Sequence, residues 1–184
     1  LSIAMGLMLI SMRMYGSRIK KAIPLFYGNL VIPETVLAMA LISFFSFCNI
    51  SLGLHTLIVS HTMIALGFVI PILYVRYKSL DPRLIEASLV LGASPRQTFF
   101  KILLPQLKPA NISISLLVFV ISFDDFILSY FCSGTSIQTL SIYLVSSLRY
   151  GISPVVNALS TLLLLGTSIA AIIFFSPKVR TRIF

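Results

Sequence analysis

The 184-residue chain has little charge and very few acidic residues. Only 10% of its residues are Asp, Glu, Lys or Arg, and five acidic residues stand against fourteen basic ones. Soluble domains carry about 25% charged residues, so this composition, with 58% hydrophobic residues, excludes an ordinary soluble fold. Apolar runs that approach the roughly 20 residues needed to cross a bilayer predict an all-α integral membrane protein. The strict alternation typical of a membrane β-barrel is absent.

A phosphate-binding loop is also missing. The pattern G-x-x-x-x-G-K-[ST] does not occur, and none of the nine glycines is followed by Lys. The chain therefore offers no evident site for ATP. We expect no cofactor on it and no enzyme activity; if ATP drives its work, a separate subunit must hydrolyse the nucleotide.

Metal and disulfide chemistry have few candidates. His55 and His61 are six residues apart, which places them on different faces of a helix, so interhelical hydrogen bonding is favoured over a metal pair. Cys48 and Cys132 lie near the ends of their predicted spans. A disulfide in an oxidising exterior stays open, but two small buried thiols are the favoured interpretation.

The apolar segments predict five helical pieces. They cover residues 1–12, 22–48, 54–77, 106–132 and 154–175. The first is too short to span and begins at Leu1, so we expect a truncated amino terminus and six spans in the full chain. Pro33 and Glu34 interrupt the second, which predicts a helix start near Pro33 and a partly irregular stretch over 25–32.

The segment 133–153 differs from the spans. Ile137, Leu140, Leu144 and Leu148 recur there at helical spacing among Ser and Thr. This pattern predicts a short amphipathic helix in an outer loop, lying at the membrane surface. The expected organisation is therefore one transmembrane domain over 1–184 with this outer loop and a polar hairpin at 81–105.

The basic residues alternate between the connecting segments. Four lie in 13–21, none in 48–54, six in 76–108, one in 133–153 and three from residue 178 onward. Under the positive-inside rule, this alternation places the 81–105 hairpin and the carboxyl tail in the cytoplasm. Because the basic residues lie between or beside the apolar runs, the net charge of +9 indicates membrane orientation and not nucleic-acid binding.

Residues 81–105 form a well-punctuated polar island between apolar segments. Asp81 is placed to cap a helix whose first residue is Pro82. Gly92 is placed to close that helix in the left-handed conformation, which costs glycine little.

A second helix is predicted directly after this corner. Ser94 is its expected cap, Pro95 its first residue, and Gln97 stands three residues after the cap, as a capping box requires. Pro105 is expected to end it. We therefore expect two short helices joined by a tight turn, built to meet another protein.

Six residues of this hairpin follow a recognisable spacing: Glu86, Ala87, Gly92, Ile102, Leu104 and Pro105. The spacing resembles the EAA signature of ABC importer permeases, which is E-A-A, three residues, G, nine residues, I-x-L-P. Only Ser88 departs from it. The stretches SFDDF at 122–126, TLSIYLVSSLRYGISP at 139–154 and VNALSTLLLL at 156–165 resemble the second membrane subunit of spermidine/putrescine importers.

The resemblance implies a type I transmembrane domain in a bacterial inner membrane. It implies that the hairpin docks into a groove on a cytoplasmic ATPase dimer, with Glu86 meeting the ATPase or bracing the hairpin and Gly92 forming the corner. It further implies a sister permease subunit, an external substrate-binding protein and a polyamine substrate. Relatives that import ferric iron, thiamine or phosphonates share much of the pattern, so these substrates stay open.

Acidic residues inside predicted spans are the second group of candidates, because ionisable groups in a membrane usually face a cavity or a partner. On a helical wheel a stripe roughly 80° wide holds Asn111, Ser115, Ser122, Asp125 and Ser129. Asp124 falls on the other side with Ser113. Asp125 is thus expected to line a pathway for a cation and Asp124 to bond a neighbouring helix, while a purely structural role for both stays open.

Glu34 is a third acid for the pathway, with a helix-start role as its alternative. The function expected from all of this is a permease that moves a solute through alternating access, coupled to an ATPase through the hairpin. The alternative class is an ion-coupled secondary transporter or channel that uses Asp124, Asp125 and Glu34 directly. A scaffold without transport is a third class, which the polar stripe disfavours.

Overall fold

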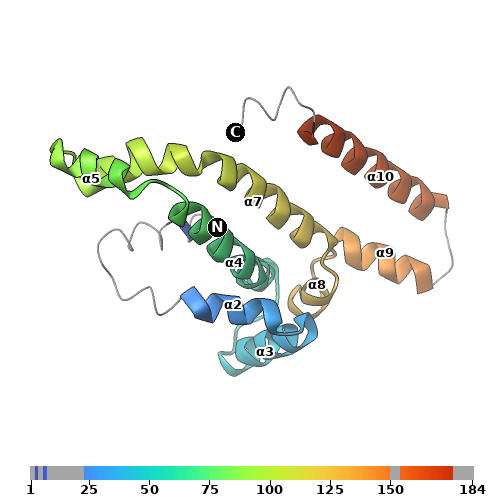
Figure 1. The fold of residues 1–184 in the computed structure, drawn as a ribbon. Helices are drawn as coiled ribbons and strands as arrows, with labels where there is room; N and C mark the ends of the chain where they lie inside the picture. Colours follow the sequence, from blue (N-terminus) through green and yellow to red (C-terminus); the bar gives the residue numbers. More distant parts are fainter. Residues whose placement is uncertain (1–2, 4–5, 8–22, 150–153, 176–184) are drawn as a thin grey trace. The chain divides into compact units, whose positions relative to one another are not determined.

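The computed structural model describes residues 3, 6–7, 23–149 and 154–175 (Figure 1). Two compact units, Leu1–Ile137 and Gln138–Phe184, are each described by themselves. All regular elements in the described ranges are helical. Most of segment 1–12, the basic loop 13–21 and the basic tail from residue 178 lie outside the described residues.

The second apolar segment forms two helices, α2 (Ile23–Val31) and α3 (Glu34–Phe47). The predicted start of a helix near Pro33 is confirmed, because Pro33 is extended and precedes the first residue of α3. The predicted irregularity over 25–32 is wrong: α2 covers nearly all of that stretch. Its Asn29 side chain donates to the Met63 carbonyl oxygen on α4 (2.6 Å), which holds α2 against that helix.

Two long helices run side by side in the first unit, α4 (Leu54–Lys78) and α7 (Leu104–Asp124). Leucine, valine and isoleucine side chains that point between them make the main buried cluster. Both are long and apolar enough to cross a membrane, α7 as the end of a continuous helix Pro95–Asp124. The cluster consists of Val69 and Leu73 from α4 with Leu103, Leu107 and Ile114.

The hairpin at 81–105 joins these two helices, and its first half follows the prediction. Helix α5 (Pro82–Val90) is capped by Asp81, whose carboxylate accepts the Arg83 N–H at 2.9 Å. Gly92 has φ +85°, and the Ala93 N–H donates to the Ser88 carbonyl oxygen, the hydrogen bond of a left-handed helix end. The expected cap, first residue and corner are therefore confirmed.

The second half of the hairpin begins as predicted but does not stop where predicted. Helix α6 (Pro95–Thr98) starts with a complete capping box, because Ser94 and Gln97 exchange hydrogen bonds of 2.8 and 3.3 Å. The expectation that Pro105 ends the helix is wrong. A π-helical turn, η2 (Phe99–Leu103), carries the helix directly into α7. The Leu104 N–H bonds the Phe99 carbonyl oxygen, and this wider turn accommodates a proline that has no N–H to donate.

The expected single span over 106–132 is also wrong. Helix α7 ends at Asp124, the backbone turns extended at Asp125, and a six-residue helix, α8 (Ile127–Cys132), follows. Helix α8 packs on α3 through a second buried cluster, made of Ala38, Leu41 and Phe45 with Leu128 and Cys132. Figure 1 shows α8 at one end of α7 and the hairpin at the other.

The described part of the second unit contains two helices. The amphipathic helix expected within 133–153 is present as α9 (Leu140–Arg149), and the last apolar segment forms α10 (Pro154–Phe175) with the expected bounds.

Candidate functional site

Two features of the first unit carry functional candidates, the hairpin and a polar cluster at the opposite end of α7. At the hairpin corner, Val90 and Leu91 are 88% and 86% exposed. A side chain added at Gly92 would meet nothing within 4 Å. The corner thus presents an apolar tip to its surroundings, and a tip so open is suited to a groove on another molecule.

The residues of the EAA spacing divide into exposed and inward-facing groups. Glu86 and Ala87 on α5 and Pro105 on α7 are exposed, while Ile102 and Leu104 are half-buried. Leu103, which lies between Ile102 and Leu104 in the chain, is buried in the core between α4 and α7. The hairpin is therefore anchored through its second helix, while its first helix stays accessible.

Ser88, the one departure from the EAA spacing, has a structural partner. Its hydroxyl lies 2.9 Å from that of Thr98 on α6, and both side chains are buried. The Ser88 hydroxyl also bonds the Ile85 carbonyl oxygen at 2.7 Å. A buried hydroxyl pair between α5 and α6 fixes the angle of the hairpin, so the serine contributes a contact that alanine cannot make.

The polar cluster forms where α7 gives way to α8. The Asp125 carboxylate accepts the Ser129 N–H at 2.8 Å and the Leu128 N–H at 3.3 Å, which caps α8. Its side chain is only 1% exposed. A buried carboxylate needs donors or a counter-charge, because desolvation of an unpaired charge is costly.

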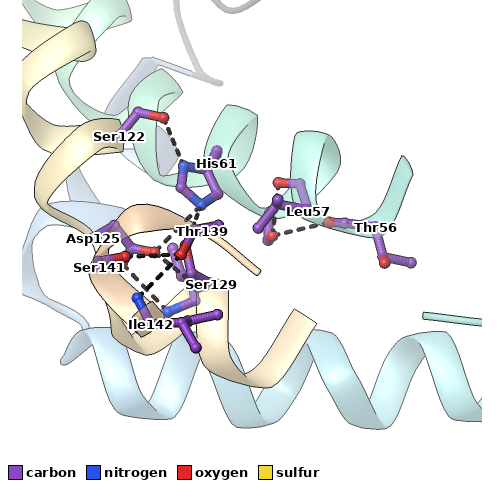
Figure 2. A network of polar contacts seen from close by, with 11 residues as sticks. Thr56, Leu57, His61, Ser122, Asp125, Ser129, Thr139, Ser141 and Ile142 are labelled. Carbon is purple, nitrogen blue, oxygen red and sulfur yellow. Dashed lines mark hydrogen bonds and ion pairs between the residues drawn. The ribbon is translucent and has the colours of Figure 1, made fainter. Parts of the chain in front are cut away.

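His61 of α4 supplies a partner from a neighbouring helix. Its Nε2 lies 3.3 Å from an Asp125 carboxylate oxygen and 3.2 Å from the Ser129 hydroxyl, while its Nδ1 lies 2.7 Å from the Ser122 hydroxyl. In Figure 2 the imidazole ring lies between Ser122 on one side and Asp125 and Ser129 on the other. The interhelical hydrogen bonding predicted for His61 is confirmed, whereas His55 is exposed.

The structure places the two adjacent aspartates differently from the helical-wheel analysis. Asp125 bonds a neighbouring helix and is buried, whereas Asp124 is exposed. The wheel assumed one straight helix through 111–129. The helix breaks after Asp124, so the side chains that follow do not point in the directions that the wheel predicts. The Glu34 carboxyl, at the start of α3, lies close enough to Asp125 and Asp124 to interact with both. Three acidic side chains therefore meet around one corner, and their role in a pathway stays a prediction.

Sequence analysis did not identify His61 as the partner of Asp125. The available signal was a short polar series in an otherwise apolar span, Thr56, Ser60 and His61. The spacing of this series places its members on neighbouring turns of α4, but only the packing of α8 shows what they contact. Cys132 is buried as predicted, and the prediction of burial is wrong for Cys48, which is exposed.

Comparison with known proteins shows to which protein family this chain belongs. Residues 2–180 match the family described as binding-protein-dependent transport system inner membrane component. The chain belongs to this family. The all-α membrane architecture expected from the sequence is therefore shown, and the chain is an inner membrane component of a binding-protein-dependent transport system.

Curated relatives of this permease carry more specific names. It is 36% identical to the spermidine/putrescine transport system permease protein PotC of Haemophilus influenzae over 86% of the chain and 62% of that protein. It is 39% identical to PotC of Escherichia coli over 72% of the chain and 50% of that protein. It is 35% identical to the putrescine transport system permease protein PotI of Escherichia coli over 73% of the chain and 50% of that protein. The permease thus spans about half to three-fifths of the length of these relatives.

Proposed function

We propose that this chain is a membrane subunit of an ATP-driven importer of polyamines, spermidine or putrescine, and that residues 81–105 couple it to a separate ATPase. The observation that carries the proposal is the hairpin, a capped and anchored element whose exposed apolar corner follows the EAA spacing. The names of the PotC and PotI relatives support the choice of substrate.

The mechanism we propose is transmission of motion along a rigid helix. Closure of two ATPase subunits would move the grooves that hold the hairpins. In this chain the hairpin continues without interruption into α7, and Leu103 and Ser122 are 19 residues apart, or about 28 Å along a helix. A movement at Gly92 would thus reach the acidic corner through one continuous helix.

The acidic corner is the proposed point of contact with the substrate. Spermidine and putrescine are polycations, and Asp124 offers them an exposed carboxylate beside Glu34 and the buried Asp125. Ser122 and Ser129 add hydroxyl groups beside this charge. Among the three acidic residues of this group, Asp124 has the most exposed side chain.

Reconstitution tests the proposal. The chain would be assembled in proteoliposomes with an ATPase, a sister permease and a polyamine-binding protein. We expect uptake of labelled spermidine or putrescine that requires ATP and the binding protein. Uptake that follows an ion gradient without the ATPase would overturn it in favour of the secondary transporter, and uptake of ferric iron, thiamine or phosphonate instead would overturn the substrate alone.

A further inference from the structure

Helix α8 is tied to α4 at both of its ends. At its carboxyl end, the buried Thr56 hydroxyl donates to the Cys132 carbonyl oxygen at 2.7 Å. The Ser60 side chain, one turn along α4, lies beside the Cys132 thiol. At its amino end, His61 contacts Asp125 and Ser129. The polar series of α4 thus follows α8 along its whole length.

These contacts matter because α8 cannot stand alone. A helix of six residues is too short to be stable by itself, and two N–H groups of α8, those of Leu128 and Ser129, donate to the Asp125 carboxylate. That carboxylate is buried and charged, so it stays in place only while a partner compensates the lost hydration. His61 of α4 compensates it together with Glu34 of α3.

We propose that His61 is a positioning residue for transport. Its imidazole holds Asp125 and α8 on α4, and this fixes the break after α7 that leaves Asp124 exposed to a cationic substrate. The proposal rests on the proposed import function. It also assigns Asp125 the holding role, since a side chain that is 1% exposed and already paired does not meet the substrate in this conformation.

Three variants of the assembled transporter test this on the kinetics of spermidine uptake. His61→Leu removes the polar contacts of both ring nitrogens. His61→Gln keeps one donor or acceptor toward α8. His55→Leu is the control, because it changes an exposed histidine of the same helix. At equal membrane abundance we expect His61→Leu to raise the KM at least tenfold, His61→Gln to recover most of that loss, and His55→Leu to match the unchanged protein.

A merely structural role would lower abundance and the maximal rate while leaving the KM where it was. An unchanged KM in His61→Leu would therefore overturn the proposal, as would an equal rise in His55→Leu.

A cross-linking measurement keeps the proposal testable without transport. Ser60→Cys places a thiol beside the native Cys132, and Cys48→Ser removes the exposed cysteine. We expect rapid disulfide formation in the assembled complex with His61 present and a severalfold slower reaction with His61→Leu. Equal rates would overturn the positioning role. Absence of polyamine uptake by the unchanged complex would instead refute the proposed function, and the two failures are thus distinguishable.

Discussion

Asp124 and Asp125 are adjacent in sequence but occupy different environments. Asp125 is buried with two backbone donors and His61, and Asp124 is exposed. Hydrogen bonds to a charged group contribute about 1.5–3 kcal/mol each when the alternative is an unsatisfied partner. Neutralising Asp125 should therefore affect the protein differently from neutralising Asp124.

We expect Asp125→Asn to reduce the amount of folded chain in the membrane, because an amide accepts the α8 N–H groups less well and gives up the charge paired with His61. Asp124→Asn should leave abundance unchanged and raise the KM for spermidine severalfold. Quantitative immunoblotting alongside uptake kinetics separates the two effects. Equal loss of uptake from both variants, at normal abundance, would contradict this division of roles.

Gly134 is required by both its conformation and its surroundings. Its φ is +70°, and a Cβ there would lie 2.8 Å from the Leu52 carbonyl oxygen. A left-handed conformation costs an L-residue about 1–2 kcal/mol, and the contact with backbone adds to that cost.

Gly134→Ala should lower the thermal midpoint of the purified protein. Gly166→Ala is the matched control, because Gly166 lies within α10 with nothing within 4 Å, where alanine favours a helix by about 0.5–1 kcal/mol. Thermal unfolding in detergent should thus shift down for the first variant and not for the second. The reverse order would refute the conformational argument.

At the scale of elements, the hairpin depends on the backbone conformation at its corner, Gly92, more than on contacts made by that residue. A side chain added at Gly92 would meet nothing within 4 Å, yet the φ of +85° at this residue is needed to turn α5 into α6. Gly92→Val should abolish most ATP-driven uptake while the chain still reaches the membrane, because the distorted tip no longer fits a groove. Gly28→Ala, another glycine with open surroundings, is the control. Normal uptake by Gly92→Val at normal abundance would show that the corner does not couple.

The buried hydroxyl pair sets the angle between α5 and α6. Ser88→Ala restores the EAA spacing but removes the bond to Thr98, and we expect a loss of about 0.5–1.5 kcal/mol in the stability of the hairpin. Thr98→Val should produce a similar loss, and the double variant should lose little more than either single one. Hydrogen exchange of the hairpin amides measures this coupling, and fully additive losses would exclude it.

For the whole molecule, the distribution of basic residues predicts which loops share a side of the membrane. The turn after α3 holds the exposed Cys48 and has no basic residue, whereas the hairpin region holds six. Under the positive-inside rule these two regions face opposite sides.

A membrane-impermeant maleimide should therefore label Cys48 in intact spheroplasts. In a Cys48→Ser background, Ser79→Cys at the exposed base of the hairpin should react only after the membrane is permeabilised. Labelling of both positions in intact spheroplasts would refute the proposed topology.

The elements whose ends depend on local chemistry could be predicted from the sequence. Asp81, Gly92, Ser94 and Gln97 act on backbone groups within five residues of themselves, and the structure has each in the expected place. The start of α3 after Pro33 follows from the same kind of local rule.

The errors arose where a local rule met a longer-range alternative. Pro105 does not end its helix, because a π-turn five residues long absorbs the missing donor. The helical wheel misplaced Asp125, because it had no means to detect that the chain breaks between Asp124 and Ile127. Both outcomes depend on partners from α4, which is distant in sequence.

The sequence by itself determined that this chain crosses a membrane as helices, that it carries a capped hairpin with an EAA spacing, and that two of its five acidic residues are adjacent at positions 124 and 125. Composition, helix caps and residue spacing are local properties, so they can be recognised in the sequence without knowledge of the fold. Only the tertiary structure decided which aspartate is buried, what Ser88 contacts and why His61 matters. Those answers depend on side chains from two helices meeting, and no single stretch of sequence specifies such a meeting.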